Sequence, residues 1–199
     1  FEGTPTKVRA VPIRAKSKLR GVTQSDSVLA VLTRHANLSQ SRIPSRQELT
    51  FNDCANDLFT MIAEGSFPDH DAPSAPPQGA PRASDGLISL DEEGRATFAS
   101  PNALSAFRRL GFSEELEGRH LAEATAGLLA GILVVDESLP LVLTGRAPWR
   151  TDIEAQGVTV TLRSIPLKRG GVRFGAIVLT RDVTQVRLRE KQMITKDAT

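Results

Sequence analysis

Four polar residues around the end of one predicted strand are the best candidates for function: Arg181, Asp182, Thr184 and Arg187. An aspartate at a helix N-cap accepts a hydrogen bond from a backbone N–H two or three residues later, and Gln185 stands where it can reach back, as in a capping box. We expect Arg181 and Arg187 to be charged partners of this junction. Hydrogen bonds and ion pairs at this junction predict that a movement of the strand is passed to the helix. The alternative is that the cap only stabilises the helix.

Two strands and a helix must position these residues. Residues 158–163 alternate apolar and polar side chains, which predicts a strand with one buried face. Gly170 and Gly171 then permit a tight hairpin turn. The return strand, 173–181, carries apolar residues on both faces, so we expect it to be central in its sheet. A helix follows from residue 184 without a loop, so a shift of the strand would move the helix.

Composition limits the classes of protein that fit. The chain has 199 residues, 40% of them hydrophobic, with 25 basic against 23 acidic residues. Residues 1–35 hold seven Lys or Arg against two acidic residues, but aromatic residues are not interleaved with them, so we expect no direct nucleic-acid binding. The single cysteine, Cys54, excludes an internal disulfide and favours a reducing compartment. Without a run of 18 apolar residues or a signal peptide, we expect a cytoplasmic protein with no membrane contact.

A proline-rich stretch divides the chain. Residues 67–84 are predicted to be a linker, since five prolines fall in this range. Before it, residues 1–66 predict two short strands and an amphipathic helix that a capping box at Ser45 and Glu48 begins. After it, residues 85–183 predict strand, strand, helices and three strands, with short helices at 114–118, 121–125 and 127–143. The expected fold class of this part is α+β, a five-stranded antiparallel sheet with helices on one face.

Several stretches carry a family resemblance. A hairpin that ends in Asp-Val-Thr at the root of a charged helix resembles the C-terminal edge of a PAS domain. VLAVLTRH, FNDCANDLFTMIAEGSFPD, ASPNALSAFRRLGFSEELEG and RDVTQVRLREKQMITKDAT together resemble the sensory half of bacterial histidine kinases of the PdtaS type, which act in phosphorylation-dependent antitermination. The resemblance implies the C-terminal part of a GAF-like domain at 1–66, a PAS domain at 85–183 and the start of a signalling helix at 184–199.

The same resemblance implies partners and an activity for a longer protein. Kinases of this family are homodimers that pass phosphate to a response regulator with an RNA-binding antitermination output. The sequence begins without Met, and we expect it to be part of a longer chain. Its residues include no ATP-binding motif, phosphoacceptor box, paired carboxylates, Ser-His-Asp set or CxxC motif, so we expect ATP and catalysis to belong to a kinase domain outside it. The same sensor joined to a cyclic-dinucleotide enzyme or a transcription factor is the alternative.

A PAS sensor holds its ligand between the sheet and the helices. The candidate pocket walls are therefore apolar side chains of those elements, namely Phe107, Leu121, Leu128, Leu129, Leu133, Val160, Leu162 and Val178. The alternative is that these residues fill an ordinary core, and the sequence does not identify a ligand. A photoactive flavin is not expected because this domain has no cysteine. Haem is not expected because His120, the only candidate axial ligand, follows Gly118 and Arg119 at a helix start. His70, between Asp69 and Asp71 in the linker, is expected to be solvated, so no metal site is predicted.

Overall fold

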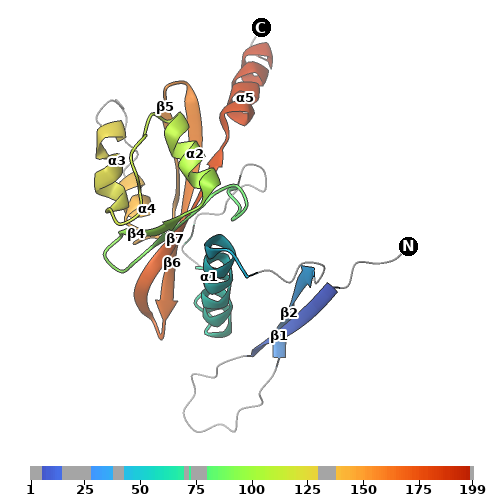
Figure 1. Ribbon diagram of the computed structural model, residues 1–199. Helices are drawn as coiled ribbons and strands as arrows, with labels where there is room; N and C mark the ends of the chain where they lie inside the picture. The colour runs from blue at the N-terminus through green and yellow to red at the C-terminus, as the bar shows by residue number, and fades with distance from the viewer. Residues whose placement is uncertain are drawn as a thin grey trace. The chain divides into compact units, whose positions relative to one another are not determined.

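The computed structural model describes residues 6–14, 28–37, 43–69, 72, 80–129 and 138–197. The chain divides into two compact units. The first comprises Phe1–His70 with Arg169–Gly171, and the second comprises Asp71–Lys168 with Val172–Thr199. Figure 1 labels the helices and strands of both units. No helix in the described part of the chain has both the length and the apolar character that a membrane span needs.

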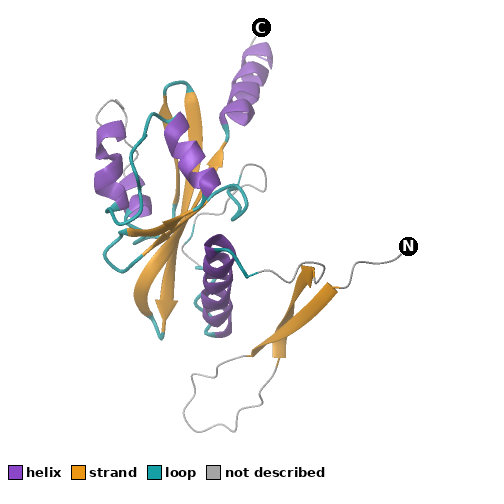
Figure 2. Ribbon diagram, in the orientation of Figure 1, coloured by secondary structure: helices purple, strands orange, loops and turns teal. Residues whose placement is uncertain are grey.

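The first unit contains a hairpin and one helix. Strands β1 (Thr6–Arg14) and β2 (Val28–Asn37) pair antiparallel, and helix α1 spans Arg46–Ala63. The predicted capping box of α1 is confirmed, because the Ser45 hydroxyl accepts from the Glu48 N–H at 3.2 Å and Glu48 Oε2 accepts from the Ser45 N–H at 2.8 Å. Cys54 and Met61 are the buried residues of this helix. The hairpin and α1 are coloured by type in Figure 2.

The second unit is built on one antiparallel sheet of five strands, as predicted. Its order is β4-β3-β7-β6-β5. The strands are β3 (Leu87–Leu90), β4 (Ala96–Ala99), β5 (Arg150–Ala155), β6 (Val158–Arg169) and β7 (Val172–Asp182). The β6–β7 turn uses Gly170 and Gly171, both with positive φ. Strand β7 lies in the middle of the sheet, which its two apolar faces predicted.

Three helices cover one face of this sheet (Figure 1). They are α2 (Pro101–Arg109), α3 (Leu121–Leu129) and α4 (Leu139–Leu143). Helix α2 is capped by Ser100, whose hydroxyl accepts from the Ala103 N–H at 3.3 Å, and Pro101 follows as its first residue. The same hydroxyl accepts from the Leu87 N–H at 2.9 Å, so the cap also joins α2 to β3. Helix α5 (Thr184–Asp197) follows β7.

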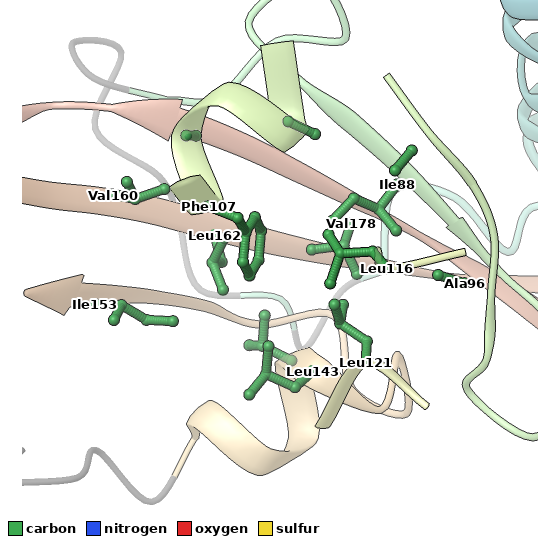
Figure 3. Close-up of a cluster of buried hydrophobic side chains, with 14 of the residues drawn as sticks. Ile88, Ala96, Phe107, Leu116, Leu121, Leu143, Ile153, Val160, Leu162 and Val178 are labelled. Atoms are coloured by element: carbon green, nitrogen blue, oxygen red, sulfur yellow. The ribbon is translucent and has the colours of Figure 1, made fainter. Parts of the chain in front are cut away.

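The core lies between the three helices and the sheet. Because side chains alternate along a strand, Val160 and Leu162 of β6 and Val178 of β7 point to the same face, where Figure 3 shows them around Phe107 of α2. Phe107 meets Phe112 edge to face, with ring centroids 6.4 Å apart. The intervening residues of each strand point to the opposite face of the sheet.

The predicted helix at 114–118 is wrong. This segment instead pairs with the free edge of β4: the Ala96 N–H donates to the Arg119 carbonyl at 2.9 Å, and the Gly118 N–H donates to the Ala96 carbonyl at 2.7 Å. Glu117 adds a side-chain bond, accepting from the Ala99 N–H at 3.0 Å. Backbone groups used in this way are not available for a helical turn. The predicted helix at 127–143 lies partly outside the described residues, and its described ends belong to α3 and α4.

Gly175 of β7 permits a close approach of two strands, and this generates a stability prediction. A Cβ built there would lie 2.5 Å from the Leu90 carbonyl oxygen, whereas a Cβ at Gly127 of α3 meets no atom within 4 Å. We expect Gly175→Ala to lower the free energy of unfolding by about 1–3 kcal/mol through overpacking. Gly127→Ala is the control and should raise it by up to about 1 kcal/mol through helix propensity. Urea unfolding of both variants measures this, and equal stabilities would contradict the packing described.

Cys54 generates a prediction about reactivity. Burial, and then the nearby carboxylates of Asp57 and Asp53, raise the pKa of the Cys54 thiol from 9.0 to about 11. Only the thiolate reacts, so at pH 8 roughly one molecule in a thousand is reactive. We expect alkylation of the folded protein by iodoacetamide to be slow at pH 8 and to accelerate about tenfold per pH unit up to pH 10. The urea-unfolded chain is the control, and equally rapid labelling of the folded protein at pH 8 would contradict the shift.

Candidate functional site

The candidate site is the junction between the central strand β7 and helix α5, which only Val183 separates. The Val183 N–H donates to the Thr159 carbonyl of β6 at 2.9 Å, so the sheet ladder continues through this residue. The Val183 carbonyl accepts from the Arg187 N–H at 2.9 Å, the first hydrogen bond of the helix. One buried residue therefore closes the ladder and opens α5, and no loop lies between them.

This arrangement corrects the predicted cap. Asp182 is the last residue of β7, and Val183 occupies the N-cap position where we expected Asp182. The physical reason is the bond of Val183 to Thr159, which keeps the chain extended one residue further than a local capping motif suggests. Asp182 still serves the helix start, because its Oδ1 accepts from the Thr184 N–H at 3.0 Å. No bond from Gln185 back to Asp182 is present among the described contacts.

Thr184 connects α5 to the neighbouring strand. Its hydroxyl oxygen accepts from the Thr159 N–H at 3.0 Å, in place of the Val183 carbonyl, which accepts from the Arg187 N–H instead. The same hydroxyl donates to Asp182 Oδ1 at 2.6 Å. Thr184 is 9% exposed, so these bonds are shielded from water. The hydroxyl thus supplies the second hydrogen bond of the Thr159–Val183 pair from a side chain that belongs to the helix.

Asp182 also reaches a helix on the core side. Its Oδ2 forms an ion pair with Arg109, the last residue of α2. The carboxyl is about a quarter exposed and the guanidinium about half exposed, so the pair contributes little to stability by itself. Its importance is geometric, because one carboxylate bonds α2 through Oδ2 and the root of α5 through Oδ1.

Arg187 forms a second connection, to the edge strand β5. Its Nη2 and Nε donate to Asp152 Oδ2 at 2.5 and 3.1 Å, and its Nη1 donates to Glu190 Oε2 at 2.9 Å. Asp152 is oriented by Thr161 of β6, whose hydroxyl donates to Oδ1 at 2.6 Å. Hydrogen bonds to Glu190 and then to Asp152 raise the pKa of Arg187 above its ordinary value, although burial opposes them. The first turn of α5 is therefore bound to β5 by a permanently charged group.

Arg181 points to a different element. Its Nη1 donates to the Ala80 carbonyl at 3.2 Å, and its Nε lies 3.8 Å from Asp85 Oδ2. Asp85 also closes a turn by accepting from the Arg82 N–H at 3.0 Å. Arg181 therefore holds the segment that leads into β3, one residue before Asp182 holds the root of α5.

The structure brings Asp182 and Thr184 into one hydrogen-bonded group and places Arg187 and Arg181 on separate partners. Three residues of this group were missed by reasoning from the sequence: Arg109, Asp152 and Thr159. The local sequence does not predict these contacts, because Arg109 is 73 residues from Asp182 and Asp152 is 35 residues from Arg187. Only the register of β5 on β6, which pairs Asp152 with Thr161, could have indicated one of them.

Five of the candidate pocket residues lie together in the core cluster. They are fully or almost fully buried, and they comprise Phe107, Leu121, Val160, Leu162 and Val178. Figure 3 shows all five pointing into the space between the helices and the sheet. Leu128 and Leu129 belong to α3, but their side chains, like the whole of Leu133, lie outside the described residues. The ligand pocket stays a prediction.

Other candidate ligands of cofactors lie apart from this cluster. His120 precedes α3 and lines a small polar pocket of about 220 Å³ with Arg95, Arg119 and Glu123. His70 and Asp71 lie outside the described residues. Within the described ranges, no group of three or more His, Cys, Asp or Glu side chains is placed to hold a metal ion.

Comparisons with known proteins agree with this architecture. The sensor histidine kinase PdtaS of Mycolicibacterium smegmatis is 40% identical over 195 residues, which cover 96% of this chain and 37% of that protein. PdtaS of Mycobacterium tuberculosis is 44% identical over 179 residues, covering 87% of this chain and 36% of that protein. The chain therefore spans a little over a third of the length of these curated relatives.

A solved structure and a family model complete the comparison. The structure, described as the sensor region of a sensor histidine kinase, is 38% identical, with a TM-score of 0.67 over 90% of this chain and 65% of that one. The model of the PAS fold matches residues 81–188, more than half of the chain and the whole of the β7–α5 junction. On this match, and on the five-stranded sheet with its covering helices, the chain belongs to the PAS-fold family.

Proposed function

We propose that this chain is the sensory and signal-relay region of a two-component histidine kinase. A change in the PAS sheet or its core is passed to α5, which controls autophosphorylation by a kinase domain. The observation that carries the proposal is the start of α5 inside the hydrogen-bond ladder of the central strand, at Val183 and Thr184. The similarity to PdtaS sensor kinases supports the output as a histidine kinase.

Three connections make the junction suitable for relay. The root of α5 is bonded to β6 through Thr184, to α2 through Asp182 and Arg109, and to β5 through Arg187. All three connections start from elements that contribute to the core, so a change in core packing alters the position of α2 or of the strands. A helix attached at three points follows such a change as a tilt or rotation. Relay requires that this attachment have two arrangements, which the experiment on the complete kinase below tests.

The wider assignment follows the relatives. We propose that residues 85–183 are the sensor domain, that 1–66 are the later part of a GAF-like domain joined by the linker 67–84, and that 184–199 begin the signalling helix. The core cluster around Phe107 is the proposed place for a small-molecule ligand. The proposed partners are a second copy of the chain and a response regulator with an RNA-binding antitermination output. Val186 and Met193 of α5 are exposed and share one face of the helix, which is suited to contact a second helix.

The Thr184 hydroxyl provides the sharpest structural test. Thr184→Val keeps the shape of the side chain but leaves the buried Thr159 N–H without its acceptor. We expect a loss of about 1–3 kcal/mol in the free energy of unfolding and faster amide exchange at Thr159. Thr184→Ser retains the hydroxyl and is the matched control. If the Thr159 amide hydrogen exchanged as slowly in Thr184→Val as in Thr184→Ser, the hydroxyl would not connect α5 to β6.

Relay itself is tested in the complete kinase. Arg187→Gln removes the ion pair with Asp152. Arg189→Gln removes an exposed charge on the other side of α5 and serves as control. We expect Arg187→Gln to change the basal rate of autophosphorylation at least about fivefold, the lower range of a coupling free energy of 1–3 kcal/mol. Autophosphorylation rates are measured with labelled ATP. Circular dichroism first checks that the variants and wild type are equally folded. Equal rates in Arg187→Gln, Arg189→Gln and wild type would count against relay through this connection.

A further inference from the structure

Two arginines face each other on the side of the sheet away from the core. Arg150 of β5 and Arg163 of β6 are direct register partners. Ile153 of β5 and Leu162 of β6 point into the core, so alternation places Arg150 and Arg163 on the opposite face. Side chains of such partners start about 5 Å apart. We refer to Arg150 and Arg163 as the arginine pair.

The arginine pair has no anionic partner among the described residues. Arg150 Nη1 is buried and makes no hydrogen bond, and Arg163 makes no ion pair or side-chain hydrogen bond in the described part of the chain. The carboxylate two residues along β5 on the same face, Asp152, is already bonded to Arg187 and Thr161. Two positive charges therefore lie side by side, and some of their N–H groups have no hydrogen-bond acceptor.

This arrangement costs free energy twice. Like charges directly opposite each other on paired strands destabilise the sheet, and a buried guanidinium N–H without an acceptor loses its hydration. One oxyanion between the two side chains would offset both costs, because guanidinium groups bind carboxylate and phosphate oxygens through pairs of parallel hydrogen bonds. We propose that the arginine pair binds a single oxyanion, the phosphate or carboxylate group of a small ligand.

The position of this site gives it a consequence for α5, which rests on the proposed relay. Asp152 and Thr161 lie two residues from Arg150 and Arg163 on the same two strands and the same face. A bound anion brings negative charge next to the Asp152 carboxylate and competes with it for Arg187. Binding at the arginine pair therefore loosens the connection between α5 and β5. The site is on the outer face of the sheet, separate from the core cluster around Phe107.

Binding is tested on the 199-residue chain with inorganic phosphate, and with acetate in parallel, at constant ionic strength set with chloride. Amide resonances of 150–153 and 161–164 are followed by NMR, together with the Nε resonance of Arg187. We expect saturable shifts, a higher Tm with the anion than without it, and apparent affinity reduced about tenfold or more in Arg150→Gln and in Arg163→Gln. A stronger response to phosphate identifies a phosphorylated ligand, and a stronger response to acetate identifies a carboxylate.

Arg146→Gln is the matched control, because Arg146 is exposed and lies outside the register of the two strands. It should bind the anion as wild type does. Shifts that do not saturate, or that persist unchanged when both arginines are replaced by glutamine, would overturn the proposed site. Saturable shifts at the arginine pair without any shift at Arg187 Nε would retain the site and overturn its effect on α5. Neither outcome depends on kinase activity, so the site and the proposed function fail separately.

Discussion

The hydrogen bond from the Thr159 N–H to the Thr184 hydroxyl is the constraint on which the arrangement of α5 depends. It lets a helix begin while its first side chain still serves the sheet. In a continued strand the Val183 carbonyl would fill this place, but here it accepts from the Arg187 N–H and begins α5. A loop would break the connection to β6. A short hydroxyl-bearing side chain satisfies both neighbours, since it accepts from the strand and donates to Asp182. The direction in which α5 leaves the domain is therefore fixed by the sheet.

The ion pairs help to orient α5 on the domain but contribute little to stability. The ion pair of Asp182 with Arg109 and that of Arg187 with Asp152 are partly exposed, and such pairs contribute little to the free energy of folding. They join α5 to helix α2 on the core face and to the edge strand β5. A weak contact is also easily exchanged for another one, and a switch needs connections that change without unfolding the domain.

Local patterns in the sequence predicted most of the fold. The alternation of 158–163, the two glycines of the hairpin and the two apolar faces of β7 depend on neighbouring residues, and they led to the central strand and the helix after it. The capping residue was misplaced by one position because a bond between strands at Val183 outweighed a local preference. The segment 114–118 was misassigned because it pairs with β4, and the partners of Asp182 and Arg187 come from distant positions that no local pattern reveals.

The pairing of segment 117–120 with β4 has a consequence for how such domains associate. A sheet with two open sides can accept neighbours on both, and molecules then add one after another into fibres. Here the β4 side is already occupied by the chain's own backbone at Gly118 and Arg119. Strand addition from another molecule is thereby blocked on that side.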